Sequence, residues 1–174
     1  MKRSDIHPMP PFFDRYINMV EDIDLIEALE KYNRIETFVT KRELEQLGDI
    51  KYAPGKWTVK EVLQHIIDNE RIQAYRALRF ARNDKSILPG YDENLFAENT
   101  NLSQTTVEEL LEEFAFTRRS NIMMFKGFSK EMLQRTGICF NVTIPVLALG
   151  FVIAGHQLHH INIIKERYFP MLLK

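Results

Sequence analysis

Histidines crowd one segment near the C-terminal end of the chain. His156, His159 and His160 lie within five residues of one another, although the whole chain contains only five histidines. If this segment is an α-helix, each residue turns about 100°, so His156 and His160 lie one turn apart on the same face. Two imidazoles in this arrangement can bind one cation together.

The rest of this segment is apolar on nearly every side. The residues expected on the face of His156 and His160 are Leu149, Val152, Ile153, Ile163 and Ile164. The residues expected on the opposite side are Leu147, Phe151, Ala154, Leu158 and Ile161. A helix of this kind is either central in its fold or lies at a subunit contact.

Two histidines are one ligand short of a catalytic zinc site, which usually has three protein ligands and one open position. His65 and His7 are the candidates for the third ligand. His65 lies in a strongly helical segment, whereas His7 lies in a proline-rich arm that we expect to be extended and exposed. We therefore predict His65, although an isolated histidine is more commonly a half-buried structural residue.

His159 has a competing claim, because it lies three residues from His156. On a helix it is about 100° away from His160, toward the polar edge that carries Asn162 and Glu166, so both cannot easily join His156. We expect His159 beside the site or at the surface.

Hydrophobic spacing predicts the elements that must position these side chains. Helices are expected at about 22–40, 58–81 and 103–126, and a last helix opens at 143–145 and ends at Pro170. Thr58 is the expected N-cap of the second helix, with Glu61 completing a capping box, and Ser103 or Thr106 is the expected cap of the third. The stretch 83–101 is predicted to be a long loop, and 136–141 an irregular or briefly extended connector.

These elements predict an all-α four-helix bundle, in which the long loop between helices two and three allows a crossover connection. We divide the chain into an N-terminal lead-in, residues 1–21, and a single helical domain, residues 22–174.

Composition limits the possible partners and location. The chain has 174 residues, 45% hydrophobic and 27% charged, with a net charge of −1, so nothing favours nucleic acid as a partner. The single cysteine, Cys139, cannot form an internal disulfide, and no signal peptide is visible, so we expect a cytoplasmic protein. The longest apolar run, 144–155, is shorter than the roughly 20 residues that span a bilayer, and we expect no membrane association.

The helix predicted at 58–81 also offers groups for chemistry. Asn69 and Arg76 share a flank with His65 and could orient an anionic substrate, with arginine clasping a carboxylate through two hydrogen bonds. Glu61 and Asp68 lie about one turn from His65 and are weak candidates for a general base. Their simpler interpretations are a capping-box member and a surface acid, and the catalytic residues stay open.

Two segments carry a resemblance to a known family. They are Ala53-Pro-Gly-Lys-Trp-Thr-Val-Lys-Glu-Val-Leu-Gln-His-Ile-Ile-Asp-Asn-Glu70 and Ala154-Gly-His-Gln-Leu-His-His-Ile-Asn-Ile-Ile-Lys-Glu-Arg-Tyr168. Both resemble the DinB-like family, and the similarity extends over roughly residues 22–168. The resemblance implies a four-helix bundle, commonly a homodimer, that holds a divalent metal through His65, His156 and His160.

The same resemblance implies two kinds of activity. Relatives include S-transferases and isomerases that use low-molecular-weight thiols, and many members are classed as metal-dependent hydrolases. We therefore expect an enzyme of hydrolase or thiol S-transferase type that acts on a small molecule. Zinc or nickel is favoured as the metal, with manganese and iron left open because imidazole suits several cations. The alternative is a non-enzymatic dimeric bundle with a structural or sensory metal, which an open coordination position would argue against.

Overall fold

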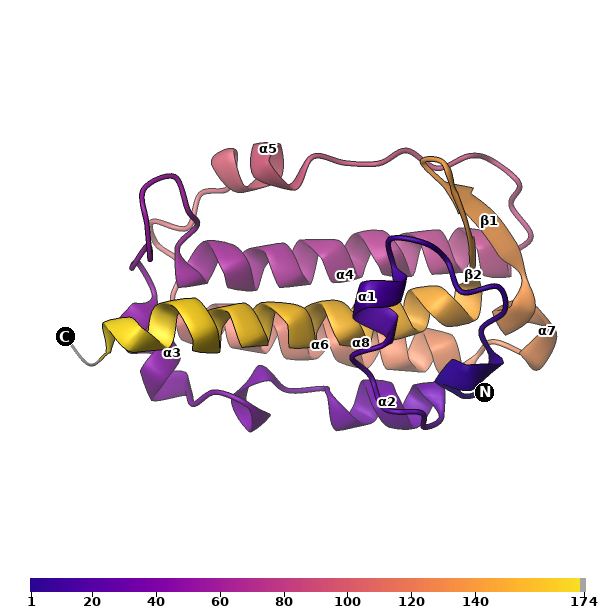
Figure 1. Ribbon diagram of the computed structural model, residues 1–174, viewed down its shortest axis with the longest axis horizontal. Coiled ribbons are helices and arrows are strands. Elements are labelled where there is room, and N and C mark those ends of the chain that lie inside the picture. Colours follow the sequence, from indigo (N-terminus) through magenta and orange to yellow (C-terminus); the bar gives the residue numbers. More distant parts are fainter. Residues whose placement is uncertain (173–174) are drawn as a thin grey trace.

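Three long helices run side by side along the molecule and form most of a four-helix bundle (Figure 1). The structure is a computed structural model, and it describes residues 1–172. The long helices are α4 (Val59–Ala81), α6 (Val107–Lys126) and α8 (Val146–Ile163). The capping box predicted for the second helix is present, because the Thr58 backbone N–H donates to Glu61 Oε2 at 2.6 Å and the Glu61 N–H donates to Thr58 Oγ1 at 3.1 Å.

The fourth side of the bundle is broken into pieces, so the continuous helix predicted at 22–40 is wrong. This side consists of α2 (Leu25–Lys31), the 3-10 turn η2 (Ile35–Thr37) and α3 (Lys41–Leu47). The helix already ends at Lys31, where Tyr32 is the C-cap, and Thr40 with Glu43 forms a capping box that starts α3 as a separate helix. The apolar spacing was real, since Leu29, Ile35 and Val39 are all buried, but it spans three elements.

The predicted crossover is present. The segment after α4 runs back along the length of the bundle before α6 begins, so α4 and α6 point in the same direction (Figure 1). It contains one short helix, α5 (Glu93–Glu98), where a plain loop was expected. Asp92 caps α5 by accepting hydrogen bonds from the backbone N–H groups of Asn94 and Leu95.

A two-stranded hairpin precedes the last helix. Its first strand agrees with the briefly extended connector predicted at 136–141, and its second strand corrects the predicted start of the last helix. Strand β1 (Thr136–Cys139) pairs antiparallel with β2 (Val142–Pro145), so 143–145 is strand and α8 begins only at Val146. The turn residues are Phe140 and Asn141, and Phe140 adopts a φ of 58°. Such turns usually carry Asn-Gly or Asp-Gly, and their absence hid the hairpin from the sequence.

Several short elements complete the fold, most of them near the two ends of the chain. The N-terminal ones are the 3-10 turn η1 (Arg3–Asp5) and α1 (Asp14–Ile17), and a short helix, α7 (Lys130–Gln134), follows α6. After α8 the chain continues through a π-helical turn, η3 (Ile164–Tyr168), and a 3-10 turn, η4 (Phe169–Met171). The N-terminal segment packs on the bundle through Ile6, Phe13 and Ile17, all of which are buried.

Glycine allows α1 to lie directly on α8. A Cβ atom at Gly155 would be only 2.0 Å from the Tyr16 carbonyl oxygen, a distance that no side chain can tolerate. The approach brings Tyr16 next to the histidines of α8.

Helix α8 is central, which is one of the two positions that its apolar sequence predicts. Its residues Leu147, Phe151, Ala154 and Ile161 are buried within this chain, and α1, α2 and α4 all pack against it. By length and composition alone, Val146–Met171 is long and apolar enough to cross a bilayer. The sequence prediction of no membrane association rested on the shorter apolar run, 144–155. However, 78% of the most apolar window of Val146–Met171 is buried, as in the core helix of a soluble bundle.

Candidate metal centre

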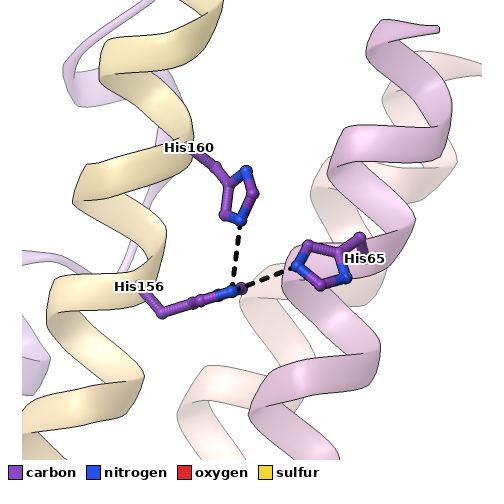
Figure 2. A group of neighbouring side chains, drawn as sticks. All are labelled: His65, His156 and His160. Atoms are coloured by element: carbon purple, nitrogen blue, oxygen red, sulfur yellow. Dashed lines mark hydrogen bonds between the residues drawn. The ribbon is translucent and has the colours of Figure 1, made fainter. Parts of the chain in front are cut away.

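Three histidine rings from two helices converge at one point inside the bundle (Figure 2). His65 projects from α4, and His156 and His160 project from α8. The Nε2 atom of His156 lies 3.1 Å from His65 Nε2 and 3.1 Å from His160 Nε2. All three residues are buried, and each offers a ligand atom within 4.8 Å of the others.

This spacing fits a single cation. Zinc–nitrogen bonds of about 2.0–2.1 Å at tetrahedral angles place two nitrogen ligands roughly 3.3 Å apart. The observed 3.1 Å contacts are close to that value. The alternative is a cluster of histidines that hydrogen-bond to one another. His156 Nε2 carries at most one hydrogen but faces two other nitrogen atoms, so one hydrogen bond cannot account for both contacts.

Burial keeps all three imidazoles neutral, as metal ligation requires. It lowers the pKa of His65 to about 4, with a smaller contribution from His159. The pKa values of His156 and His160 lie well below 6.5, mainly because both rings are buried and also because the neighbouring His65 and His159 disfavour a charge on either ring. At neutral pH the nitrogen lone pairs are therefore available without the loss of a proton.

The histidines form part of the wall of a large cavity of about 1350 Å³. Trp57 lies beside His65, with ring centroids 4.9 Å apart, and Tyr16 packs edge-on against His156 at 5.2 Å. Other residues that line this pocket are Asn69, Gln73, Arg76, Tyr91, Asp92, Glu93, Cys139 and His159. A cation held by the three histidines would therefore have a side that faces this open pocket.

Comparison with known proteins places the chain in a family. The model of the DinB superfamily matches residues 28–164, which include all three histidines of the cluster. The chain belongs to the DinB superfamily. A search of curated proteins found no match.

A solved structure supports the fold of this DinB superfamily member. It is described as "YfiT from Bacillus subtilis is a probable metal-dependent hydrolase with an unusual four-helix bundle topology". The two chains superpose with a TM-score of 0.63 over 91% of this chain and 87% of YfiT, at 20% sequence identity. At this identity the likeness establishes the four-helix bundle fold, as the sequence predicted.

His159 lies where the helical wheel places it, half-buried beside the cluster. It lines the cavity and packs edge-on against Tyr16, with ring centroids 5.4 Å apart. Burial lowers the pKa of His159, as does the charge of Arg15, whereas Glu166 raises it. It is not one of the three residues whose ligand atoms converge.

Asn69 and Arg76 both line the cavity and both are buried. The Asn69 side-chain amide donates to the Tyr91 hydroxyl at 2.7 Å. Arg76 donates to Gln73 Oε1 at 3.2 Å and to the Pro89 carbonyl oxygen at 2.7 Å. The flank predicted to orient a substrate therefore does face the same space as the histidines.

Glu61 and Asp68 lie elsewhere. Both line a separate void of only about 10 Å³ on another side of His65. Glu61 is occupied by its capping box, and Asp68 accepts from Gln64 Nε2 at 2.9 Å. Burial raises the pKa of Asp68, although the charge of Arg71 and the bond from Gln64 oppose it.

Three cavity residues were missed by the sequence reasoning. Tyr16 comes from α1, and Tyr91 and Glu93 come from the crossing segment. Burial raises the pKa of both tyrosine hydroxyls, so they stay protonated at neutral pH. Only the acidic group around Asp92 and the length of the loop hinted that the crossing segment has a function.

Proposed function

We propose that this protein is a metal-dependent hydrolase in which His65, His156 and His160 hold one divalent cation. The observation that carries the proposal is the convergence of three buried, neutral Nε2 atoms on one point beside a large cavity. The description of YfiT as a probable metal-dependent hydrolase supports the reaction class. Zinc or nickel is the proposed cation.

The groups around such a cation would have different roles in the reaction. When bound, the cation would supply Lewis-acid chemistry and lower the pKa of a water or thiol molecule that it binds. Trp57 and Tyr16 limit the access of solvent to the histidine rings. Glu93 lines both the cavity and the small void beside His65, and we propose its carboxylate as the proton acceptor.

Metal analysis tests the ligand set. Protein purified without a histidine tag is expected to contain about one divalent ion per chain, as three-histidine catalytic sites do. The ion should be lost in His65→Ala, His156→Ala and His160→Ala and kept in the matched control His159→Ala. Equal metal content in all of these proteins would refute the assignment.

Turnover distinguishes the reaction classes. A panel of esters, amides and thiol acceptors should show metal-dependent hydrolysis, which Glu93→Gln lowers by roughly 10²–10⁴-fold and Asp68→Asn leaves unchanged. Turnover only in the presence of a low-molecular-weight thiol would instead identify an S-transferase. A metal-loaded protein that turns over nothing would favour a structural or sensory site.

The homodimer and the cytoplasmic location that the sequence suggests are carried forward as proposals. A dimer would have to use a surface other than the back of α8, which is buried within the chain. Light scattering coupled to size-exclusion chromatography should give about twice the chain mass of 20.5 kDa, and the monomer mass would contradict it.

A further inference from the structure

Arg76 is a buried cation with neutral partners only. Its side chain is 5% exposed, and it donates to the Gln73 amide oxygen and to the Pro89 carbonyl. Among residues 1–172, no carboxylate forms an ion pair with it. A buried charge without a counterion is costly, so a fold that keeps one has a use for it.

The same bundle neutralises its other buried arginine completely. Arg118 is 0% exposed, and its guanidinium donates to both carboxylate oxygens of Glu70, at 2.8 and 2.9 Å. Glu70 also accepts from Asn121 Nδ2 at 3.1 Å. Arg118 is therefore a structural arginine with its counterion built in, and Arg76 lines the cavity without one.

Two carboxylates, those of Asp92 and Glu93, line the same pocket as Arg76. Asp92 caps α5 through two backbone N–H groups. Glu93 is exposed in the first turn of α5. Neither forms an ion pair with the Arg76 guanidinium among the described residues.

Asn69 lies between Arg76 and the histidines along α4, and in the described part of the chain its side-chain oxygen lacks a hydrogen-bond partner, just as Arg76 lacks a counterion. It is 7% exposed, its Nδ2 donates to Tyr91, and its Oδ1 is buried without a partner. On a helix, Asn69 and Arg76 both fall within about 40° of His65, so the three follow one line along α4. Along α4 the chain therefore presents a proposed metal ligand, His65, then a hydrogen-bond acceptor, Asn69 Oδ1, and then a cation, Arg76.

From this line we propose a substrate class, which rests on the hydrolase function proposed above. The substrate is an elongated anion: a carboxylate that binds Arg76, an N–H or O–H group that donates to Asn69 Oδ1, and a reacting group at the histidines. His65 and Arg76 are eleven residues apart, about 16 Å along the helix axis. The contact with Gln73 shows that the guanidinium lies back toward His65, which shortens this span. A chain of several bonds fits it, and a small anion such as acetate does not.

The test uses a matched pair of probes that differ in the charge at one end. They are 6-acetamidohexanoate and its neutral amide 6-acetamidohexanamide, titrated by NMR into metal-free protein, so that the carboxylate cannot bind a cation at the histidines instead of Arg76. The acid should bind at least about tenfold more tightly than the amide, because a charge-assisted pair replaces a neutral contact. Arg76→Gln should bring the ratio close to one, and Arg82→Gln, which removes an exposed charge from the end of the same helix, should leave it unchanged.

A second variant tests the missing counterion directly. Gln73→Glu places a carboxylate where Gln73 Oε1 now accepts from Arg76 at 3.2 Å. It should raise Tm and abolish the preference for the acid, because Arg76 is then neutralised from within. Equal binding of acid and amide by the wild type, or a preference that survives Arg76→Gln, would overturn the proposal.

The outcomes separate this proposal from the proposed function. If the histidines bind no metal but the metal-free protein prefers the acid, the metal centre fails and the anion subsite stands. If metal loads at one ion per chain but the two probes bind equally, the anion subsite fails and the metal centre stands.

Discussion

At the scale of single residues, the Arg118–Glu70 pair should be a main determinant of stability. Replacing Arg118 by Met leaves the Glu70 carboxylate buried with only Asn121 as a partner. We expect the free energy of unfolding, measured in urea, to fall by about 3–5 kcal/mol. The neighbouring exposed residue provides the control, since Arg119→Met should change it by less than about 0.5 kcal/mol.

A double variant tests whether the cost of Arg118→Met comes from the unpaired charge of Glu70. Glu70→Leu combined with Arg118→Met removes both charges, and such replacements are often close to neutral. The double variant should therefore be more stable than Arg118→Met alone. If it is less stable, the cost of the single variant comes from lost packing and not from an unpaired charge.

Cys139 should be an unreactive thiol in the folded protein. Burial raises its pKa from 9.0 to about 11, and the side chain is 2% exposed. At pH 8 this shift alone lowers the thiolate fraction, and hence the rate of alkylation, by roughly a hundredfold relative to the unfolded chain. Alkylation by iodoacetamide, followed by mass spectrometry between pH 7 and 10, should be fast in urea and slow without it. Similar rates in both conditions would contradict the burial of Cys139.

The residues of the cluster could be predicted, and the residues around them could not. His156 and His160 are four apart on a helix, so local geometry is enough to place both rings on one face. His65 needed only a second helix in contact with the first. Tyr16 and Glu93 come from segments whose positions depend on tertiary contacts, and no periodicity in the sequence encodes those contacts.

At the scale of elements, hydrophobic periodicity identified helices but not their breaks. The helices predicted at 58–81 and 103–126 correspond to α4 and α6, and Thr58 and Thr106 cap them. The helix predicted at 22–40 ends at Lys31, and Thr40 and Glu43 form a capping box that starts α3 as a separate helix. That signal was present in the sequence, but the buried apolar residues on both sides of it suggested continuity.

Gly155 should be essential for the contact between α1 and α8. Gly155→Ala places a Cβ atom 2.0 Å from the Tyr16 carbonyl oxygen, so the backbone of α1 must move. We expect the free energy of unfolding to fall by about 1–3 kcal/mol and proteolysis of the N-terminal segment to become faster. Gly48→Ala is the control, because its added Cβ would meet no atom closer than 3.5 Å. Equal effects of the two substitutions would show that the close contact with Tyr16 is not the cause.

At the scale of the whole molecule, the crossover connection makes the cavity. The segment after α4 returns along the length of the bundle (Figure 1). Tyr91 and Glu93 of this segment line the same pocket as the three histidines. The hairpin closes the other end, where Leu88 forms a backbone bridge with Cys139. The sequence predicted a long loop and a possible crossover, but the pocket between these segments depends on packing between distant parts of the chain.

A cation at the three histidines would tie α4 to α8 and should stabilise the entire fold. A ligand that binds only the folded state adds about 2.7 kcal/mol at a free concentration of 100 times Kd. For a domain of this size we expect zinc or nickel to raise Tm by several degrees over protein in EDTA. The increase should vanish in His65→Ala, which breaks the link from the α4 side, and persist in His7→Ala, whose side chain is exposed and outside the cluster. Differential scanning calorimetry measures both effects, and a metal-dependent increase that survives in His65→Ala would mean that the cation binds somewhere other than between these two helices.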